Sequence, residues 1–178
     1  AAAGGVGLIV CQWAKHLGAT VIGTVGSEEK AALARTHGCD HTINYRTENF
    51  TERVMEITDG KGLPVVYDSI GKDTFEGSRD CLRRRGIMVT FGNSSGPVPS
   101  FNPGILNVKG SLMLTRPTLA HFVATREELL AVSGELFEVV TSGHVRIEVN
   151  QTYPLSDTAQ AHVDLEARKT TGSTVLLP

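Results

Sequence analysis

Short apolar runs alternate with amphipathic segments along roughly the first 120 residues of the chain. The apolar runs are rich in β-branched residues, as is typical of strands, and lie at 20–25, 41–44, 65–69, 86–91 and 110–114. Between them, segments with helical periodicity lie at 8–17, 28–36, 50–57 and 75–82. Strands that are almost continuously apolar and separated by helices are typical of a parallel sheet covered on both faces. The pattern predicts an α/β fold with a doubly wound parallel sheet.

Several residues predict where these helices begin and end. Gly18 and Gly38 suit helix C-termini, where a left-handed backbone is common. Ser27 suits the N-cap of the helix that follows it, and Thr47 is the expected cap of the helix at 50–57.

The last third of the chain has a different pattern. A long amphipathic helix is expected at 126–142, ended by Gly143, and is followed by the short run 145–149 and a turn at 153–155. A helix from Ser156 to about Arg168 and a strand at 173–177 complete the pattern.

The composition fits a globular protein without a membrane span. The chain has 178 residues, 40% of them hydrophobic and 20% charged, with a net charge of −2. This charge also argues against nucleic-acid binding, which requires clustered cations. The one basic cluster, Arg83–Arg85, is interpreted as the C-terminus of the preceding helix.

The three cysteines, Cys11, Cys39 and Cys81, lie far apart in the sequence and form no Cys-x-x-Cys pair. Such scattered thiols fit a reducing cytosol, and each is interpreted as a buried, inert residue. We expect no zinc site and a cytoplasmic location.

The start of the chain has the spacing of a dinucleotide-binding turn. Ala2, Gly4 and Gly7 follow the G-x-G-x-x-G pattern, with alanine in first place. Gly4 would let backbone amides approach a pyrophosphate, and Gly7 would let the next helix pack closely. The amides of Gly5 and Val6 would then face the phosphates at a helix N-terminus. A glycine-rich turn before a helix is common, so it is the surrounding α/β pattern that gives this motif its weight.

Ser27 and Lys30 follow the strand at 20–25, where an NAD site would usually carry Asp or Glu. Neither would repel a 2′-phosphate, so both favour NADP. The alternatives are that Ser27 is only a helix cap and Lys30 a solvated charge, or that Glu28 or Glu29 binds a ribose hydroxyl and reverses the preference.

No catalytic constellation of side chains is evident. Asp68 ends a strand, where hydrogen bonds to loop amides are as plausible as catalysis. The histidines have no serine or carboxylate partner at a suggestive spacing and are interpreted as surface or helix-terminal residues; they are His16, His37, His41, His121, His144 and His162.

Seven segments together resemble one family: AAAGGVG, GTVGSEEK, INYR, VVYDSIG, RRRGIMVTFGNSSG, NVKGSLMLTRPTL and EARKTTGSTVLLP. They resemble the NADPH:quinone oxidoreductases, the zeta-crystallin-like, zinc-free branch of the medium-chain dehydrogenase/reductase superfamily. The resemblance runs from Ala1 to Pro178, and FGNSSG combined with the TRP segment is far more specific than the glycine turn.

The resemblance implies a subunit with a GroES-like catalytic domain and a Rossmann domain. We expect the body of the catalytic domain and the first Rossmann strand to precede this sequence. The implied parts are an NADP-binding Rossmann domain at 1–120, a connecting helix at 121–144, and a C-terminal segment at 145–178 that belongs to the catalytic domain.

The resemblance also implies NADPH as the cofactor and assigns residues to its phosphates. The pyrophosphate would lie at Gly5 and Val6, beside Gly4 of the turn. The 2′-phosphate would be surrounded by groups from separate parts of the chain: Gly26, Ser27, Lys30, Tyr45 and Arg168. Without the resemblance, Tyr45 would be interpreted as a packing residue and Arg168 as a solvated charge.

The remaining cofactor residues follow from the same resemblance. Ser69 matches a position beside the adenine or ribose. The loop at the nicotinamide consists of Phe91, Gly92, Asn93, Ser94 and Ser95, whose backbone groups would hold the carboxamide. The segment that closes over the nicotinamide end consists of Pro117, Thr118 and Leu119.

The implied activity is NADPH-dependent reduction of quinones by hydride transfer, with solvent as the proton source and no catalytic side chain. Reduction of an activated alkene, such as an enal or enone, is the alternative. A non-catalytic role, as a crystallin-like or RNA-binding protein, is a third. A homodimer formed through the sheet edge at 110–115 is expected, with no membrane partner. In this fragment we expect weak cofactor binding, no turnover, and exposed apolar surface on 145–178 that promotes association or fraying.

Overall fold

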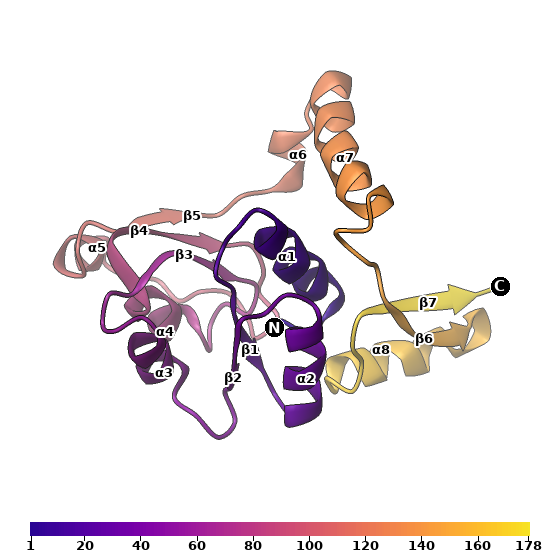
Figure 1. The fold of residues 1–178 in the computed structure, drawn as a ribbon, viewed down its shortest axis with the longest axis horizontal. Helices are drawn as coiled ribbons and strands as arrows, with labels where there is room; N and C mark the ends of the chain where they lie inside the picture. Colours follow the sequence, from indigo (N-terminus) through magenta and orange to yellow (C-terminus); the bar gives the residue numbers. More distant parts are fainter. The chain divides into compact units, whose positions relative to one another are not determined.

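The computed structural model describes residues 1–178, which form two compact units (Figure 1). The first unit comprises Ala1–Thr47 and Val132–Pro178, and the second comprises Glu48–Ala131. All strand pairs in both units are parallel.

The first part of unit 1 is a β-α-β arrangement preceded by a helix. It contains α1 (Gly5–His16), β1 (Ile22–Val25), α2 (Glu28–Thr36) and β2 (His41–Asn44), and β1 pairs with β2. Small and sulfur-containing side chains fill its core, which consists of Ala2, Ala3, Cys11, Val25, Ala31, Ala34 and Cys39. The predicted helix at 28–36 and strand at 41–44 have the bounds that the pattern indicated.

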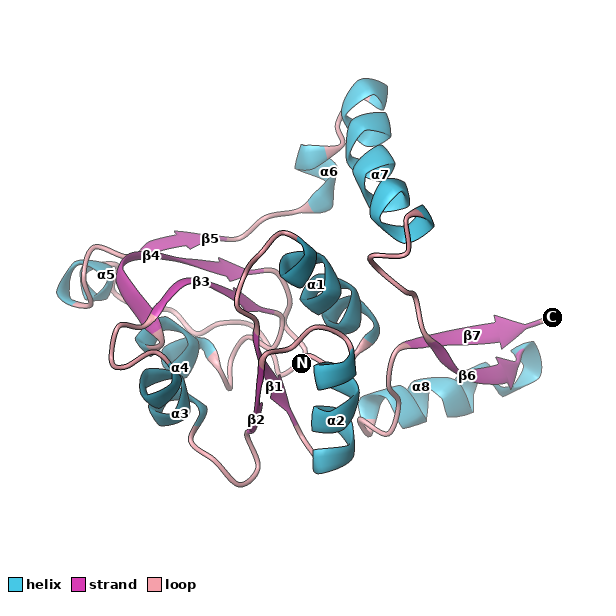
Figure 2. Cartoon of the chain, in the orientation of Figure 1, coloured by secondary structure: helices cyan, strands magenta, loops and turns pink.

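The last part of unit 1 is a second β-α-β arrangement. It contains β6 (Val149–Pro154), the short 3-10 helix η1 (Leu155–Asp157), α8 (Thr158–Glu166) and β7 (Ser173–Leu177). β6 pairs with β7, and α8 lies beside the pair (Figure 2). The final strand was predicted at these residues. The preceding strand, expected at 145–149, lies at Val149–Pro154 and includes Tyr153 and Pro154 of the expected turn.

Unit 2 is a three-stranded sheet of order β3-β4-β5 with helices packed against it. Its elements are α3 (Phe50–Ile57), β3 (Leu63–Asp68), α4 (Phe75–Asp80), β4 (Leu82–Thr90), α5 (Gly104–Val108), β5 (Met113–Thr115) and α6 (Leu119–Phe122). The core beneath the sheet consists of Phe75, Leu82, Met88 and Leu112. The amphipathic helix α7 (Arg126–Thr141) begins in unit 2 and ends in unit 1.

The strand orders confirm the predicted fold class. The order β2-β1 in unit 1 corresponds to strands 3-2 of the doubly wound fold, and β3-β4-β5 corresponds to strands 4-5-6. Successive parallel strands are joined through helices, as that fold requires.

Two predictions at helix ends were wrong. The cap of α3 is Asn49, whose side-chain oxygen accepts hydrogen bonds from the amides of Thr51 and Glu52. Thr47 lies too far ahead of the helix, and its hydroxyl donates to the carbonyl of Asn44 instead. The helix expected at 75–82 ends at Asp80, because Leu82 already pairs with Leu63 in the sheet.

The arginine run was also assigned to the wrong element. Arg83–Arg85 lie inside β4, at an irregularity where the register with β3 shifts, and Arg85 has a positive φ of 58°. The bulge explains why a basic run occurs within a strand, because all three side chains remain exposed.

Candidate cofactor-binding site

The glycine-rich turn precedes α1 directly. Gly4 is the N-cap residue in an extended conformation, and the helix begins at Gly5. A Cβ on Gly7 would lie 2.2 Å from the carbonyl oxygen of Ala1, so no other residue fits there. The turn therefore needs glycine at this position because its own backbone closes over the first turn of the helix. Val6 is 61% exposed, which leaves the start of α1 open on that side.

Four of the five residues predicted around a 2′-phosphate are joined by direct contacts within unit 1. Lys30 Nζ donates to the carbonyl oxygens of Arg168 (2.6 Å) and Thr170 (3.2 Å). Arg168 Nη1 lies 3.4 Å from Tyr45 Oη and donates to it. A Cβ on Gly26 would lie 2.8 Å from Tyr45 Oη, so glycine makes room for the phenol.

The fifth residue, Ser27, caps α2, because its Oγ accepts from the Lys30 amide at 3.2 Å. The predicted cap is thus confirmed, while the interpretation of Lys30 as a solvated charge is wrong. Glu28 and Glu29 lie exposed in the first turn of α2.

The two charged side chains of this cluster, Lys30 and Arg168, are both positive. Neither Lys30 nor Arg168 forms an ion pair with a carboxylate. Two neighbouring cations without an acidic partner, next to a phenol hydroxyl, make an arrangement that suits a phosphate dianion.

The segment that carries Arg168 is held by side chains that the sequence did not reveal. Gln151 Nε2 donates to the carbonyls of Thr171 (2.9 Å) and Ser173 (3.2 Å), and Asn150 Nδ2 donates to Thr171 Oγ1 (2.9 Å). The amide of Gly172 donates to the carbonyl of Ala3 at 3.1 Å, so this segment also contacts the glycine-rich turn. A pair of polar residues opposite a Thr-Thr-Gly segment gives no signal in the sequence, because the contact depends on β6 pairing with β7.

In unit 2, Asp68 organises the loop after β3. The residue is 4% exposed; its Oδ1 accepts from the amides of Ile70 (2.8 Å) and Gly71 (3.0 Å), and its Oδ2 accepts from the hydroxyls of Thr74 and Ser78, both at 2.7 Å. Burial alone would raise the pKa of this carboxyl group, but the four hydrogen bonds outweigh it and lower the pKa. Asp68 therefore has the loop-supporting role that its position at the strand end suggested.

The predicted nicotinamide loop, residues 91–95, is hydrogen-bonded to the loop that follows β3. Ser94 donates its amide to the carbonyl of Ser69 (3.2 Å), and Ser95 donates both its amide (2.9 Å) and its hydroxyl (2.8 Å) to the carbonyl of Ile70. A Cβ on Gly92 would lie 2.4 Å from the Ser69 carbonyl oxygen, so the two loops can approach only with glycine there. Residues 91–95 and Ser69 thus form one connected structure at the carboxyl ends of β3 and β4.

The other predicted members of this site lie after β5. Thr118 is the extended N-cap residue of the short helix α6, and Leu119, its first residue, is 71% exposed. Phe91, which belongs to the loop at residues 91–95, is 38% exposed at the end of β4.

His37, the C-cap residue of α2, is helix-terminal as expected, but it has a carboxylate partner. His37 is buried, and its Nε2 lies 3.1 Å from Glu148 Oε1 while its Nδ1 contacts the carbonyl of Leu33. The carboxylate partner lies 111 residues away in sequence, so no spacing could reveal it. His16 stacks on His144 at a centroid distance of 3.8 Å. No group of three or more His, Cys, Asp or Glu is arranged to hold a metal ion.

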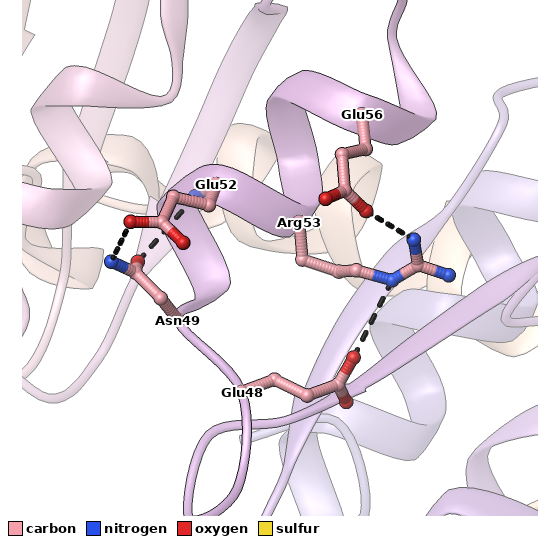
Figure 3. Close-up of a pocket in the computed structure, with 5 residues that line it drawn as sticks. All are labelled: Glu48, Asn49, Glu52, Arg53 and Glu56. Carbon is pink, nitrogen blue, oxygen red and sulfur yellow. Dashed lines mark hydrogen bonds and ion pairs between the residues drawn. The ribbon is translucent and has the colours of Figure 1, made fainter.

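Two surface pockets lie away from the predicted cofactor residues. One, of about 300 Å³, surrounds the start of α3, where Arg53 pairs with Glu48 and Glu56 and Asn49 bonds to Glu52 (Figure 3). The other, of about 500 Å³, is lined by Arg83–Arg85 and Met113. None of the eight helices combines the length and the apolarity needed to cross a bilayer.

The chain is similar to known proteins over its whole length. Residues 5–136 match the family described as zinc-binding dehydrogenase. Over its whole length the chain is 60% identical to a quinone oxidoreductase from Pseudomonas aeruginosa, of which it covers 55%, and 53% identical to a 2-haloacrylate reductase from a Burkholderia species, of which it covers 54%.

Solved structures give the same result. The crystal structure of Escherichia coli quinone oxidoreductase complexed with NADPH matches all of this chain with a TM-score of 0.96 at 57% identity, and 55% of that protein is covered. The chain thus spans about half the length of the relatives that it matches. It belongs to the zinc-binding dehydrogenase family and is similar throughout to the quinone oxidoreductases of that family.

Proposed function

We propose that the protein containing this chain uses NADPH to reduce quinones, and that the chain supplies most of the cofactor site. The proposal rests on two neighbouring cations, Lys30 and Arg168, that have no carboxylate partner. Lys30 Nζ donates to the backbone carbonyl of Arg168, and Arg168 Nη1 donates to Tyr45 Oη. Relatives at 57–60% identity are named quinone oxidoreductases, and one of them binds NADPH in its crystal structure.

The residues of unit 1 fit the phosphates of NADPH. Gly26 leaves the space above Tyr45 that a larger residue would fill, and the two cations supply charge-assisted donors for the 2′-phosphate. The pyrophosphate would lie at the start of α1, where Gly4, Gly5 and Val6 offer backbone amides and the positive end of the helix dipole.

The residues of unit 2 fit the nicotinamide end. In this proposal the backbone groups of residues 91–95 hold the carboxamide, Ser69 lies beside the adenine or ribose, and Pro117, Thr118 and Leu119 cover the ring. The hydrogen bonds from Ser94 and Ser95 to the neighbouring loop would keep those backbone groups fixed before the cofactor binds.

In this proposal, hydride transfer needs no catalytic side chain from this chain. When bound, NADPH supplies a hydride from its nicotinamide ring. The chain's own part is to orient that ring and to keep water from one of its faces, while solvent provides the proton for the product oxyanion. We therefore assign no catalytic residue.

The test is a titration of the full-length protein with NADPH and NADH, together with Lys30→Ala and Arg168→Ala. Loss of one charge-assisted contact should weaken NADPH binding about 10- to 100-fold in each variant and leave NADH binding unchanged. Lys169→Ala is the matched control, because Lys169 is adjacent to Arg168 but pairs with Asp164.

Equal or tighter binding of NADH by the wild type would contradict the proposal. It would mean that Glu28 or Glu29 binds the ribose hydroxyl instead. Folding of each variant is checked by circular dichroism before the titration.

Reduction of an activated alkene is the second candidate, favoured by the 53% identity to a 2-haloacrylate reductase. The same cofactor residues would serve both reactions. Parallel assays of the full-length protein with quinones, enals and 2-haloacrylates under NADPH consumption distinguish the two. Full-length protein that binds NADPH but reduces none of them would favour a non-catalytic role.

We further propose a domain division at 1–120, 121–144 and 145–178, a reaction that needs no zinc, and a cytoplasmic location. Three free cysteines fit a reducing compartment. We also propose a homodimer formed through the edge strand β5, which pairs only with β4 and carries the half-exposed Met113.

A further inference from the structure

We propose that Cys11 and Cys39 form a reversible intrachain disulfide when the protein meets peroxide, which makes this pair a redox-sensitive modification site. The two Sγ atoms lie 3.3 Å apart, although the residues are 28 positions apart in sequence. Cys11 lies in α1, and Cys39 lies in the connection between α2 and β2.

Two glycines bring the thiols together. Gly38 has a positive φ of 93°, and a Cβ there would lie 3.0 Å from the carbonyl oxygen of Cys11, so only glycine lets this connection run so close to α1. A Cβ on Gly23 would lie 2.6 Å from Cys39 Sγ, so glycine in β1 also provides the space that the sulfur occupies. The contact between the thiols is thus fixed by the backbone.

Little movement separates this contact from a bond. A disulfide has a sulfur–sulfur distance of about 2.05 Å, so the two atoms must approach by about 1.2 Å. Rotation of the two cysteine side chains about their Cα–Cβ bonds is the movement that would bring the sulfur atoms to this distance.

The contact also makes the two thiols chemically unequal. Cys39 donates its S–H to Cys11 Sγ, and this hydrogen bond lowers the pKa of Cys11 against the opposing effect of burial. The same hydrogen bond, together with burial, raises the pKa of Cys39. Cys11 is therefore the thiol that ionises first, and the thiolate is the form that reacts.

The reaction with hydrogen peroxide balances without another reagent. The Cys11 thiolate attacks one peroxide oxygen, an S–O bond forms, the O–O bond breaks, and the departing hydroxide takes the proton that Cys11 had released. Cys39 sulfur then attacks Cys11 sulfur; the S–S bond forms, the S–O bond breaks, and the leaving hydroxide accepts the Cys39 proton. Two thiols are oxidised and one peroxide is reduced to two waters.

Cys81 provides an internal comparison. It is 2% exposed, burial raises its pKa to about 11, and its thiol is hydrogen-bonded with Thr51 and not with a second thiol. It should stay reduced under the same treatment. Cys11 and Cys39 are themselves 6% and 5% exposed, so the small peroxide molecule must enter through local opening of unit 1.

The experiment treats the chain with hydrogen peroxide, blocks the remaining thiols and maps its tryptic peptides by mass spectrometry. We expect the thiol count to fall from three to one, with peptide 1–15 joined to peptide 36–46 and peptide 80–83 unmodified; dithiothreitol should restore all three thiols. In Cys39→Ser, whose hydroxyl keeps a donor beside Cys11 but cannot form a disulfide, a dimedone-type probe should label Cys11 as its sulfenic acid. The control Cys81→Ala should still form the disulfide.

Three results would overturn the proposal. The first is that Cys11 and Cys39 both remain free at a peroxide dose that oxidises the urea-unfolded chain. The second is a disulfide that involves Cys81 or joins two chains. The third is labelling of Cys81 instead of Cys11 by the sulfenic-acid probe in a Cys39→Ser variant that circular dichroism shows to be folded.

Discussion

At several positions of this chain, atoms close to the Cα leave room only for glycine. Gly7, Gly26 and Gly92 each stand where a Cβ would lie less than 3 Å from another group, whether backbone or the Tyr45 phenol. The sequence predicted a role for each of them, but the structure gives different reasons. For Gly7 the obstacle is the preceding turn, and for Gly92 it is the carbonyl of Ser69.

Asp68 shows how a residue at a strand end can be structural. Its four hydrogen bonds hold the loop that in turn holds residues 91–95. Because burial leaves its carboxylate without water, those bonds are its only compensation.

We expect Asp68→Asn to lower the free energy of unfolding by about 2 kcal/mol at pH 7, because hydrogen bonds to a charged group are replaced by bonds to a neutral one. The folded-state pKa is lowered, so the stabilisation is complete above the unfolded value of about 3.8 and disappears as the pH falls through the folded value. Urea unfolding at pH 7 and at pH 3 measures both effects.

The difference between wild type and variant should therefore shrink at pH 3. Asp73→Asn is the control, because Asp73 is exposed and its backbone amide, not its carboxylate, donates to Ser95 Oγ. A difference that grows on acidification would contradict the assigned sign of the pKa shift.

At the scale of elements, the bounds that depend on local sequence signals were predicted correctly, whereas bounds that depend on long-range pairing were not. The helix at 28–36 and the strands at 41–44 and 173–177 were predicted with their observed bounds, because periodicity and caps act within a few residues. The strand β4 was predicted too short, because its first residues are the arginine run that only the pairing with β3 makes extended.

The β6–β7 pair illustrates a contact between elements that the cofactor proposal depends on. Gln151 on β6 bonds to the segment 171–174, which follows Arg168. The position of that arginine thus depends on a side chain from another strand.

We expect Gln151→Ala to increase hydrogen exchange of the amides at 168–173, because the variant loses all the hydrogen bonds that the amide group donates. Exchange at 41–46, in the other strand pair of unit 1, should remain unchanged and serves as the control. Hydrogen–deuterium exchange read by mass spectrometry checks this. Unchanged protection at 168–173 would mean that the backbone bonds from Gly172 and Ser173 hold the segment alone.

For the whole molecule, the distribution of apolar surface is the main feature. Six large apolar side chains in 145–178 are at least half exposed: Ile147, Val149, Leu155, Val163, Leu165 and Leu177. The exposure predicted for this segment is confirmed, and the chain spans only 55% of its quinone oxidoreductase relatives. Such a surface is typical of an interface with another part of a protein.

We therefore expect the isolated chain to bind a hydrophobic dye such as ANS and to associate at high concentration. Val163→Ser combined with Leu165→Ser should reduce dye fluorescence, because both side chains are more than half exposed on α8. Leu17→Ser removes a 75% exposed residue outside the segment and should change the signal less. Weak dye binding by a monodisperse wild-type chain would contradict this expectation.

The sequence by itself determined the fold class, most helices and strands and the glycine-rich turn, because these depend on periodicity, caps and motif spacing along the chain. The set of residues around Tyr45 was implied by the family resemblance, and no spacing along the chain predicts it. Only the tertiary structure decided that Lys30 binds the carbonyls after Arg168, that His37 contacts Glu148, and that Cys11 touches Cys39. The physical reason is that such contacts join residues between 28 and 140 positions apart, and their distances are set by strand pairing and helix packing, which spacing along the chain does not encode.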